Sequence, residues 1–157
     1  DDHDYVGNNT DRTSPGRAQA LRAFEDYQPN GTYGQPGAPG ALQLAALRAR
    51  LAEALNYVST EVHKTYSPFF YGLEGEAKAK QSALLDARLQ VVEDRLATRD
   101  WLAGDAYTPA DAYFFTVTNW SKGVGHDLSP FPRVQALRDK VAARPAVQKA
   151  MQAEGLI

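Results

Sequence analysis

The sequence contains no cysteine among its 157 residues. Disulfide bonds, thiolate nucleophiles and cysteine-ligated zinc are therefore excluded for this chain acting alone. It also lacks any run of about 18 consecutive apolar residues, the length that a transmembrane helix requires. No charged, apolar and small-residue leader opens it, as a signal peptide would. We therefore expect a cytoplasmic protein.

Neither sign of charge dominates, since 17 Lys and Arg face 19 Asp and Glu, which gives a net charge of -2. The basic residues are spread among acidic ones and form no stripe that would bind a phosphate backbone. We expect neither nucleic acid nor a membrane as a partner. A hydrophobic content of 43% is that of a globular chain with one core, and this length leaves little room for a second full domain.

Glycine and proline are concentrated in one stretch. They occupy seven of the twelve positions from Pro29 to Gly40. Both residues disfavour helix interiors, and proline removes a backbone donor from a strand. We therefore expect residues 1–40 to be a mostly irregular arm or linker with one short helix from Ser14 to about Tyr27. Residues 41–157 are expected to form a separate helical domain.

Apolar residues in the second part recur with the period of an α-helix. The spacing predicts a long core helix from about residue 44, which Pro68 ends or kinks. A second amphipathic helix is predicted from about Glu76 to Thr98. The buried stripe of the first comprises Leu44, Leu47, Leu51, Leu55, Val58, Val62, Tyr66 and Phe69, and that of the second comprises Leu85, Leu89, Val92 and Leu96.

The start of a helix is predicted at Thr108-Pro109-Ala110-Asp111. Threonine suits the N-cap, proline the first helical position, and an acidic third residue can bond back to the cap as in a capping box. This motif overrules the strand propensity of residues 113–118 and predicts a helix from Pro109 to about Gly123. Because that helix is apolar nearly all round, we expect it at the centre of a bundle.

Two further helices follow the glycine-rich break. One carries Val134, Leu137 and Val141, and the last begins at Arg144-Pro145 and stops at Gly155. No strand-like period of two recurs across several segments. The predicted fold class is all-α, a bundle of about five helices.

A polar row lies beside the first apolar stripe. Asn56, Thr60 and His63 recur at spacings of four and three on the shoulder of the stripe, where a side chain can be partly desolvated and still reach a cleft. A neutral histidine donates at one ring nitrogen and accepts at the other, and it exchanges protons near neutral pH. His63 is thus a candidate for chemistry, although the row also suits hydrogen-bonded bundle residues. The pattern of the polar row by itself predicts that Lys64 is a solvated charge.

Four blocks together resemble the helical C-terminal domain of the bacterial, beta-class glutathione transferases. The resemblance extends over roughly residues 41–157, and the order and spacing of the blocks fit. The blocks are residues 56–64 (Asn-Tyr-Val-Ser-Thr-Glu-Val-His-Lys), 101–104 (Trp-Leu-Ala-Gly), 108–113 (Thr-Pro-Ala-Asp-Ala-Tyr) and 144–148 (Arg-Pro-Ala-Val-Gln). The His-Lys block is specific to that class, whereas the capping-box block is widespread among related proteins.

The resemblance implies a fold, an activity and residue roles. It implies a glutathione-transferase C-terminal-like bundle that acts in detoxification as a homodimer, with glutathione as co-substrate and no metal. His63 would be catalytic and face the glutathione sulfur, Lys64 would lie near the tripeptide, and Asn56 would reach the glutathione site of the neighbouring subunit. The pocket for an apolar co-substrate would be lined by Tyr66, Phe70, Tyr113 and Trp120. Thr108 and Asp111 would be a structural cap, whose loss costs about 1 kcal/mol.

The chain departs from this family at its beginning. A thioredoxin-like domain with most of the glutathione contacts and an active-site cysteine precedes the helical domain in the beta class. Residues 1–40 contain no cysteine and no strand-length alternating run, and a unit this small rarely folds by itself. Most of a glutathione site is thus missing.

Three readings follow. The chain is a transferase subunit that conjugates glutathione to apolar electrophiles when a thioredoxin-like domain complements it. Alternatively, it is a non-catalytic module for dimerisation, scaffolding or binding of apolar ligands. The third reading is capture of copper or nickel by Asp1-Asp2-His3, if Asp1 is the true terminus.

Overall fold

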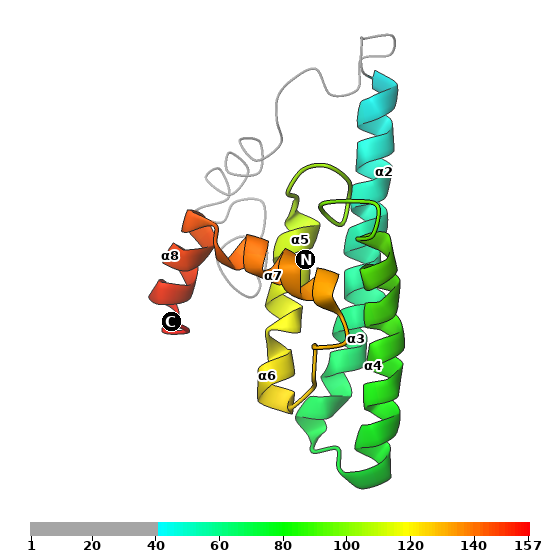
Figure 1. The fold of residues 1–157 in the computed structure, drawn as a ribbon, viewed down its shortest axis with the longest axis vertical. Helices are drawn as coiled ribbons and strands as arrows, with labels where there is room; N and C mark the ends of the chain where they lie inside the picture. Colours follow the sequence, from blue (N-terminus) through cyan, green and yellow to red (C-terminus); the bar gives the residue numbers. More distant parts are fainter. Residues whose placement is uncertain (1–40) are drawn as a thin grey trace, which may run out of the picture. The chain divides into compact units, whose positions relative to one another are not determined.

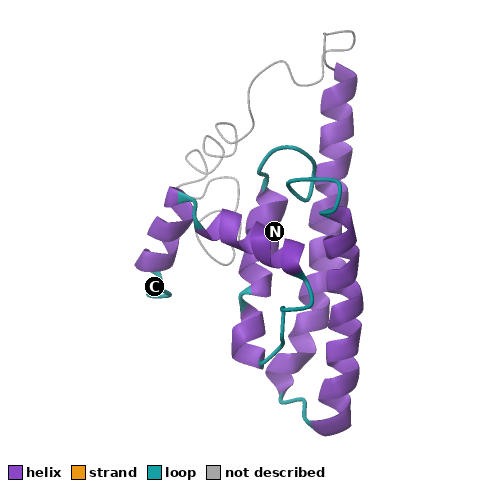
Figure 2. Ribbon diagram, viewed as in Figure 1, coloured by secondary structure: helices purple, strands orange, loops and turns teal. Residues whose placement is uncertain are grey.

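The structure is a computed structural model that describes the backbone of residues 41–157 and the side chains from residue 45 onward. Residues Ala45–Ile157 form one compact unit. All regular elements described are helical, as Figures 1 and 2 show, and this confirms the predicted all-α fold class. The predicted arm, its short helix and the Asp1-Asp2-His3 motif lie outside the described residues, so the domain boundary near residue 40 stays a prediction.

The first long helix changes its geometry along its length. It comprises α2 (Ala41–Tyr57), a π-helical segment (Val58–His63), α3 (Lys64–Tyr66) and a 3-10 turn (Ser67–Tyr71). Pro68 lies in the first turn of the 3-10 segment, so the predicted change at this proline is confirmed. The π-helical segment was not foreseen from the sequence. Such segments are rare and often occur at functional sites.

Five further helices complete the described part of the chain. They are α4 (Gly75–Arg95), α5 (Pro109–Thr118), α6 (Trp120–Val124), α7 (Pro132–Ala142) and α8 (Pro145–Ala153). α5 and α6 together occupy the range predicted as one helix, with Asn119 between them. α4 ends at Arg95 rather than Thr98. Among the described helices, none combines the length and the apolar character that a membrane span needs.

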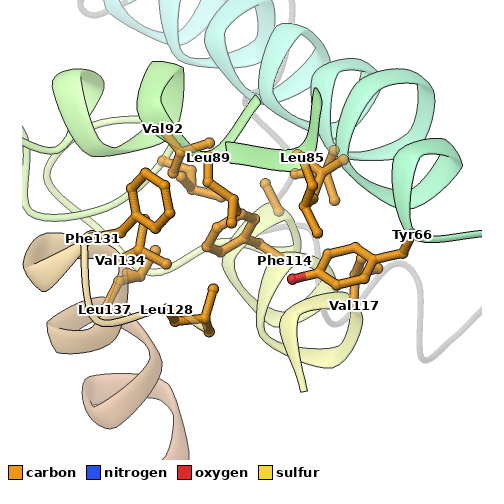
Figure 3. Close-up of a cluster of buried hydrophobic side chains, with 14 of the residues drawn as sticks. Tyr66, Leu85, Leu89, Val92, Phe114, Val117, Leu128, Phe131, Val134 and Leu137 are labelled. Carbon is orange, nitrogen blue, oxygen red and sulfur yellow. The ribbon is translucent and has the colours of Figure 1, made fainter. Parts of the chain in front are cut away.

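α5 occupies the centre of the compact unit. It packs against the π-helical segment and against α7, while α4 packs against the π-helical segment, α3 and α7. Figure 1 shows α4 running beside the long helix and α7 crossing α5. Phe114 of α5 is fully buried and lies amid the labelled side chains of Figure 3. The buried neighbours around it come from several helices and the loop before α7, and include Leu85, Leu89, Leu128 and Val134.

The long helix is less buried at its beginning than its apolar stripe predicts. Val58, Val62, Tyr66 and Phe69 belong to the buried core. Leu47, however, is 39% exposed, so its prediction as a core residue was wrong. The main packing contacts of α4 and α5 with the long helix are made by its π-helical segment and the turns after it, which lie beyond Leu47 in the chain.

The start of α5 is held by a buried carboxylate. The Asp111 side chain is fully buried. Its Oδ2 accepts hydrogen bonds from the backbone N–H of Thr108 (2.7 Å) and from the Thr108 hydroxyl (2.8 Å), in a capping-box arrangement. Its Oδ1 accepts from the backbone N–H of Leu102 at 2.8 Å. Asp111 therefore fixes both the helix start and the loop before it.

A second buried carboxylate joins α4 to α7. Glu93 is 4% exposed. It accepts hydrogen bonds from the backbone N–H groups of Arg133 (3.0 Å) and Val134 (2.9 Å) in the first turn of α7. The backbone donors in a first helical turn have no partner within the helix, so Glu93 satisfies them across the core. The sequence analysis missed this residue. Its only local signal is an acidic side chain four positions after buried Leu89.

Candidate functional site

His63 is held by side chains from two other helices. It is the last residue of the π-helical segment and is half-buried. Its Nδ1 lies 2.6 Å from the hydroxyl oxygen of Tyr113 on α5. The ring of Trp120 on α6 packs edge-on against the imidazole, with centroids 4.9 Å apart and planes at 74°. The packing of α5 against the π-helical segment thus places His63 beside residues fifty and more positions away.

Trp120 is the centre of what we call the aromatic cluster, formed by His63, Tyr66, Phe70, Tyr113 and Trp120. Phe70 meets the Trp120 ring edge-on at a centroid distance of 5.2 Å, and Tyr66 does so at 6.0 Å. The structure therefore brings His63 together with the residues that the resemblance assigns to an apolar pocket. Phe70 is 55% exposed, which gives the cluster an accessible apolar edge.

Tyr66 belongs to the core side of the aromatic cluster. It is fully buried, and its hydroxyl shares a hydrogen bond of 2.5 Å with Ser121 Oγ. Burial raises the pKa of the Tyr66 hydroxyl, which the Ser121 bond partly opposes. Tyr66 therefore packs against Trp120 from the core and does not form part of the exposed edge of the aromatic cluster. Ser121 was missed by the sequence analysis because its partner lies 55 residues away and no local pattern links the two.

Asn56 and Lys64 stand apart from the aromatic cluster. Both are exposed. The backbone oxygen of Asn56 accepts a hydrogen bond from Thr60 Oγ1 at 2.9 Å, which is local to the helix. Between residues 45 and 157, no hydrogen bond or ion pair connects the side chain of Asn56 or Lys64 to the cluster. Any joint action of these two residues with His63 requires a ligand or a second subunit.

A second histidine, His126, packs against Tyr66 on the core side of the aromatic cluster. Its side chain is 5% exposed, and its Nε2 lies 3.2 Å from Asp86 Oδ1. Its ring contacts Tyr66 and Phe69, with centroids 6.5 Å and 6.3 Å away. Burial lowers the pKa of His126 below the usual value of about 6.5, although the carboxylates of Asp86 and Asp127 oppose the shift.

The lowered pKa predicts a pH dependence of stability. The folded protein binds a proton at His126 less readily than the unfolded chain does. The contribution of His126 is therefore complete above about pH 6.5 and is lost as the pH falls below that value. Urea unfolding of the wild type and of His126→Gln between pH 8 and 5.5 tests this. We expect the difference in unfolding free energy to shrink as the pH falls; a difference that grows would contradict it.

A separate apolar groove lies between α5, α7 and α8. Its volume is about 310 Å³, and its lining includes Phe115, Val141, Val147 and Met151. None of the predicted site residues lines it. Within the described part of the chain, no three His, Cys, Asp or Glu side chains are grouped so that they could hold a metal ion.

Comparison with known proteins agrees with the resemblance. The sequence model of the family described as "Glutathione S-transferase, C-terminal domain" matches residues 54–145. The chain is 39% identical to the glutathione S-transferase GstA of Escherichia coli O157:H7 over 110 residues, which is 69% of this chain and 55% of that protein. It is 35% identical over 123 residues to the glutathione S-transferase GST-4.5 of Xanthomonas campestris pv. campestris, which is 71% of this chain and 59% of that protein.

Solved structures give the same result. The crystal structure of a glutathione transferase from Methylococcus capsulatus str. Bath matches with a TM-score of 0.70 and 43% identity, covering 88% of this chain and 66% of that one. A beta-class glutathione S-transferase from Sphingomonas chungbukensis matches with a TM-score of 0.68 and 28% identity, covering 88% and 67%. The chain thus spans somewhat more than half the length of its curated relatives. It belongs to the glutathione S-transferase C-terminal domain family.

Proposed function

We propose that this chain is the helical part of a glutathione transferase, which conjugates glutathione to apolar electrophiles when a thioredoxin-like domain complements it. The observation that carries the proposal is the placement of His63 within the aromatic cluster, where His63 and the exposed Phe70 both pack against the Trp120 ring. A polar group that can contact a sulfur thus adjoins an apolar surface for the second substrate. A sphingomonad glutathione S-transferase solved in complex with glutathione is 33% identical to this chain, with a TM-score of 0.68.

In the proposed reaction, the glutathione thiolate attacks an electrophilic carbon. The sulfur electron pair forms the new carbon–sulfur bond, and the leaving group departs with the pair of the bond that breaks. A hydrogen bond from His63 would stabilise the thiolate, and stabilising an anion by a positioned donor is a strong catalytic device. The exposed edge of the aromatic cluster would hold the electrophile through apolar and ring contacts.

Two further residues are assigned to the tripeptide. Lys64 is exposed one residue after His63 and supplies a cation for an anionic tripeptide. Asn56, exposed on α2, would contact the glutathione of the neighbouring subunit in a homodimer. Light scattering of the purified chain tests whether it is a dimer. We also propose a cytoplasmic location, which fractionation of expressing cells tests.

The test joins a thioredoxin-like domain of the beta-class type to the amino end of the full chain. We expect this fusion to conjugate glutathione to an aromatic halide. His63→Ala should lower turnover about ten- to hundredfold, because a hydrogen bond to a charged group contributes about 1.5–3 kcal/mol and each 1.4 kcal/mol is a factor of ten. Initial rates measure the effect, and thermal unfolding checks that the variant still folds.

Lys80→Ala serves as the control, since that side chain is 76% exposed on α4 and pairs with Glu76 on the same helix. Its turnover should equal that of the parent fusion. A folded fusion that neither binds glutathione nor turns over would overturn the proposal and leave the non-catalytic module. Equal turnover in His63→Ala and the parent would remove His63 from the reaction.

A further inference from the structure

We infer that Tyr113 is a positioning residue that fixes the tautomer of His63. Its phenol O–H donates to Nδ1, so that the ring carries its own hydrogen at Nε2. This assignment differs from the role implied by the resemblance, in which Tyr113 is a wall of the apolar pocket. Its catalytic meaning rests on the proposed function, whereas the tautomer itself is a property of the chain alone.

The geometry restricts the imidazole at two points. The 2.6 Å contact joins Nδ1 specifically to the Tyr113 hydroxyl. The Trp120 ring stands at 74° to the imidazole plane, and the Tyr113 ring also stands at 74°. Trp120 is itself packed by Phe70 on the exposed side and by Tyr66 in the core. Rotation of the His63 ring would therefore break a short hydrogen bond and disturb the aromatic cluster.

The direction of the hydrogen bond follows from the chemistry of the two groups. A neutral imidazole has one N–H donor and one bare nitrogen acceptor, and a phenol hydroxyl can do either. Phenols are far stronger acids than neutral imidazole N–H groups, and imidazole nitrogens are far stronger bases than phenol oxygens. The favoured arrangement is phenol O–H to bare Nδ1. No carboxylate among the described residues contacts His63 to favour the opposite tautomer.

The tautomer decides what His63 can do for a sulfur. With its hydrogen at Nε2, the His63 ring can donate a hydrogen bond from Nε2 to an anionic sulfur. Nε2 then has no free lone pair with which to remove a proton from a thiol. His63 would then stabilise a thiolate that is already formed, and the thiol proton would leave to water beforehand. The opposite tautomer would make Nε2 a base. The hydroxyl of Tyr113 thereby selects hydrogen bonding over proton abstraction.

Side-chain ¹⁵N–¹H correlation NMR of the full chain at pH 8 tests the inference. The chain has three histidines, and loss of one signal set in His63→Gln assigns His63. We expect wild-type His63 to be the Nε2–H tautomer alone. In Tyr113→Phe, the Nδ1 and Nε2 shifts should move toward each other as the two tautomers mix.

Tyr57→Phe is the matched control. It removes a tyrosine hydroxyl from the long helix that carries His63, where that hydroxyl donates to the Arg88 carbonyl oxygen at 3.0 Å. This substitution should leave the His63 signals unchanged. A wild-type spectrum showing the Nδ1–H tautomer would overturn the inference. So would identical His63 signals in the wild type and Tyr113→Phe.

Kinetics of the fusion separates this inference from the proposed function. Tyr113→Phe should lower kcat while KM for the electrophile stays within twofold. A rise in KM alone would make Tyr113 a wall residue and overturn its positioning role. If no fusion variant turns over while the NMR shifts appear as expected, the proposed function fails and the tautomer assignment stands.

Discussion

Replacing Asp111 by alanine is expected to lower the free energy of unfolding by about 3–5 kcal/mol. The substitution leaves the backbone N–H groups of Leu102 and Thr108 without an acceptor. Both residues are buried, so water cannot easily replace the carboxylate, and each unsatisfied donor costs about 1–3 kcal/mol. This exceeds the loss of about 1 kcal/mol expected for an ordinary cap. Urea unfolding followed by tryptophan fluorescence measures it.

Two variants define the origin of the Asp111 effect. Asp111→Asn keeps the shape of the side chain but turns one acceptor into a donor. Its free energy of unfolding should therefore lie between that of the wild type and that of Asp111→Ala. Asp127→Ala removes an exposed carboxylate that accepts from the Ser129 N–H at 2.8 Å, and its effect should be much smaller because water can replace it. If Asp111→Ala were no more harmful than Asp127→Ala, the buried cap would not be a principal support of the fold.

Glu93→Ala should lower the free energy of unfolding by about 2–4 kcal/mol. The N–H groups of Arg133 and Val134 lose their acceptor, and Val134 is fully buried. The carboxylate also lies at the positive end of the α7 helix dipole, which favours a negative charge. Because Glu93 belongs to α4, its loss should weaken the attachment of α7 in particular. Urea unfolding gives the total effect, and amide hydrogen exchange locates it.

Glu53→Ala is the matched control for Glu93. Glu93 forms an ion pair with the Arg133 guanidinium at 3.3 Å. Glu53 likewise forms an ion pair, with Arg95 at 2.6 Å, but the Glu53 side chain is 58% exposed. Exposed pairs contribute less than about 1 kcal/mol, so the loss should be small. In Glu93→Ala, exchange should accelerate in the first turn of α7 before it does in α5. Uniform acceleration throughout the unit would argue against a local role at α7.

Local patterns in the sequence correctly predicted the helices of the described residues and the start of α5. The apolar spacing of Val58 and Val62 defines a buried face without reference to any partner, because side chains three and four apart share one side of a helix. The Thr108-Asp111 capping box also lies within one turn. The resemblance to the transferase family rests on the same short blocks. It therefore gave the family, which the comparisons bear out.

Contacts between distant residues were beyond the sequence patterns. Nothing local indicates that His63 meets Tyr113, or that Glu93 reaches Val134, because these pairs lie 50 and 41 residues apart and depend on how the helices pack. The π-helical segment was also not predicted, because apolar spacing at a period of 3.6 residues does not distinguish a π-helical turn from an α-helical one.

The sequence by itself thus determined the helical class, the family and the presence of a histidine beside an apolar stripe. Only the tertiary structure decided which ring nitrogen of His63 is engaged, and that Phe70 forms the exposed edge of the aromatic cluster. The physical reason is that periodicity reports which face of one helix is apolar. The partner of each side chain on that face is set by the packing of helices that the chain brings together from far apart.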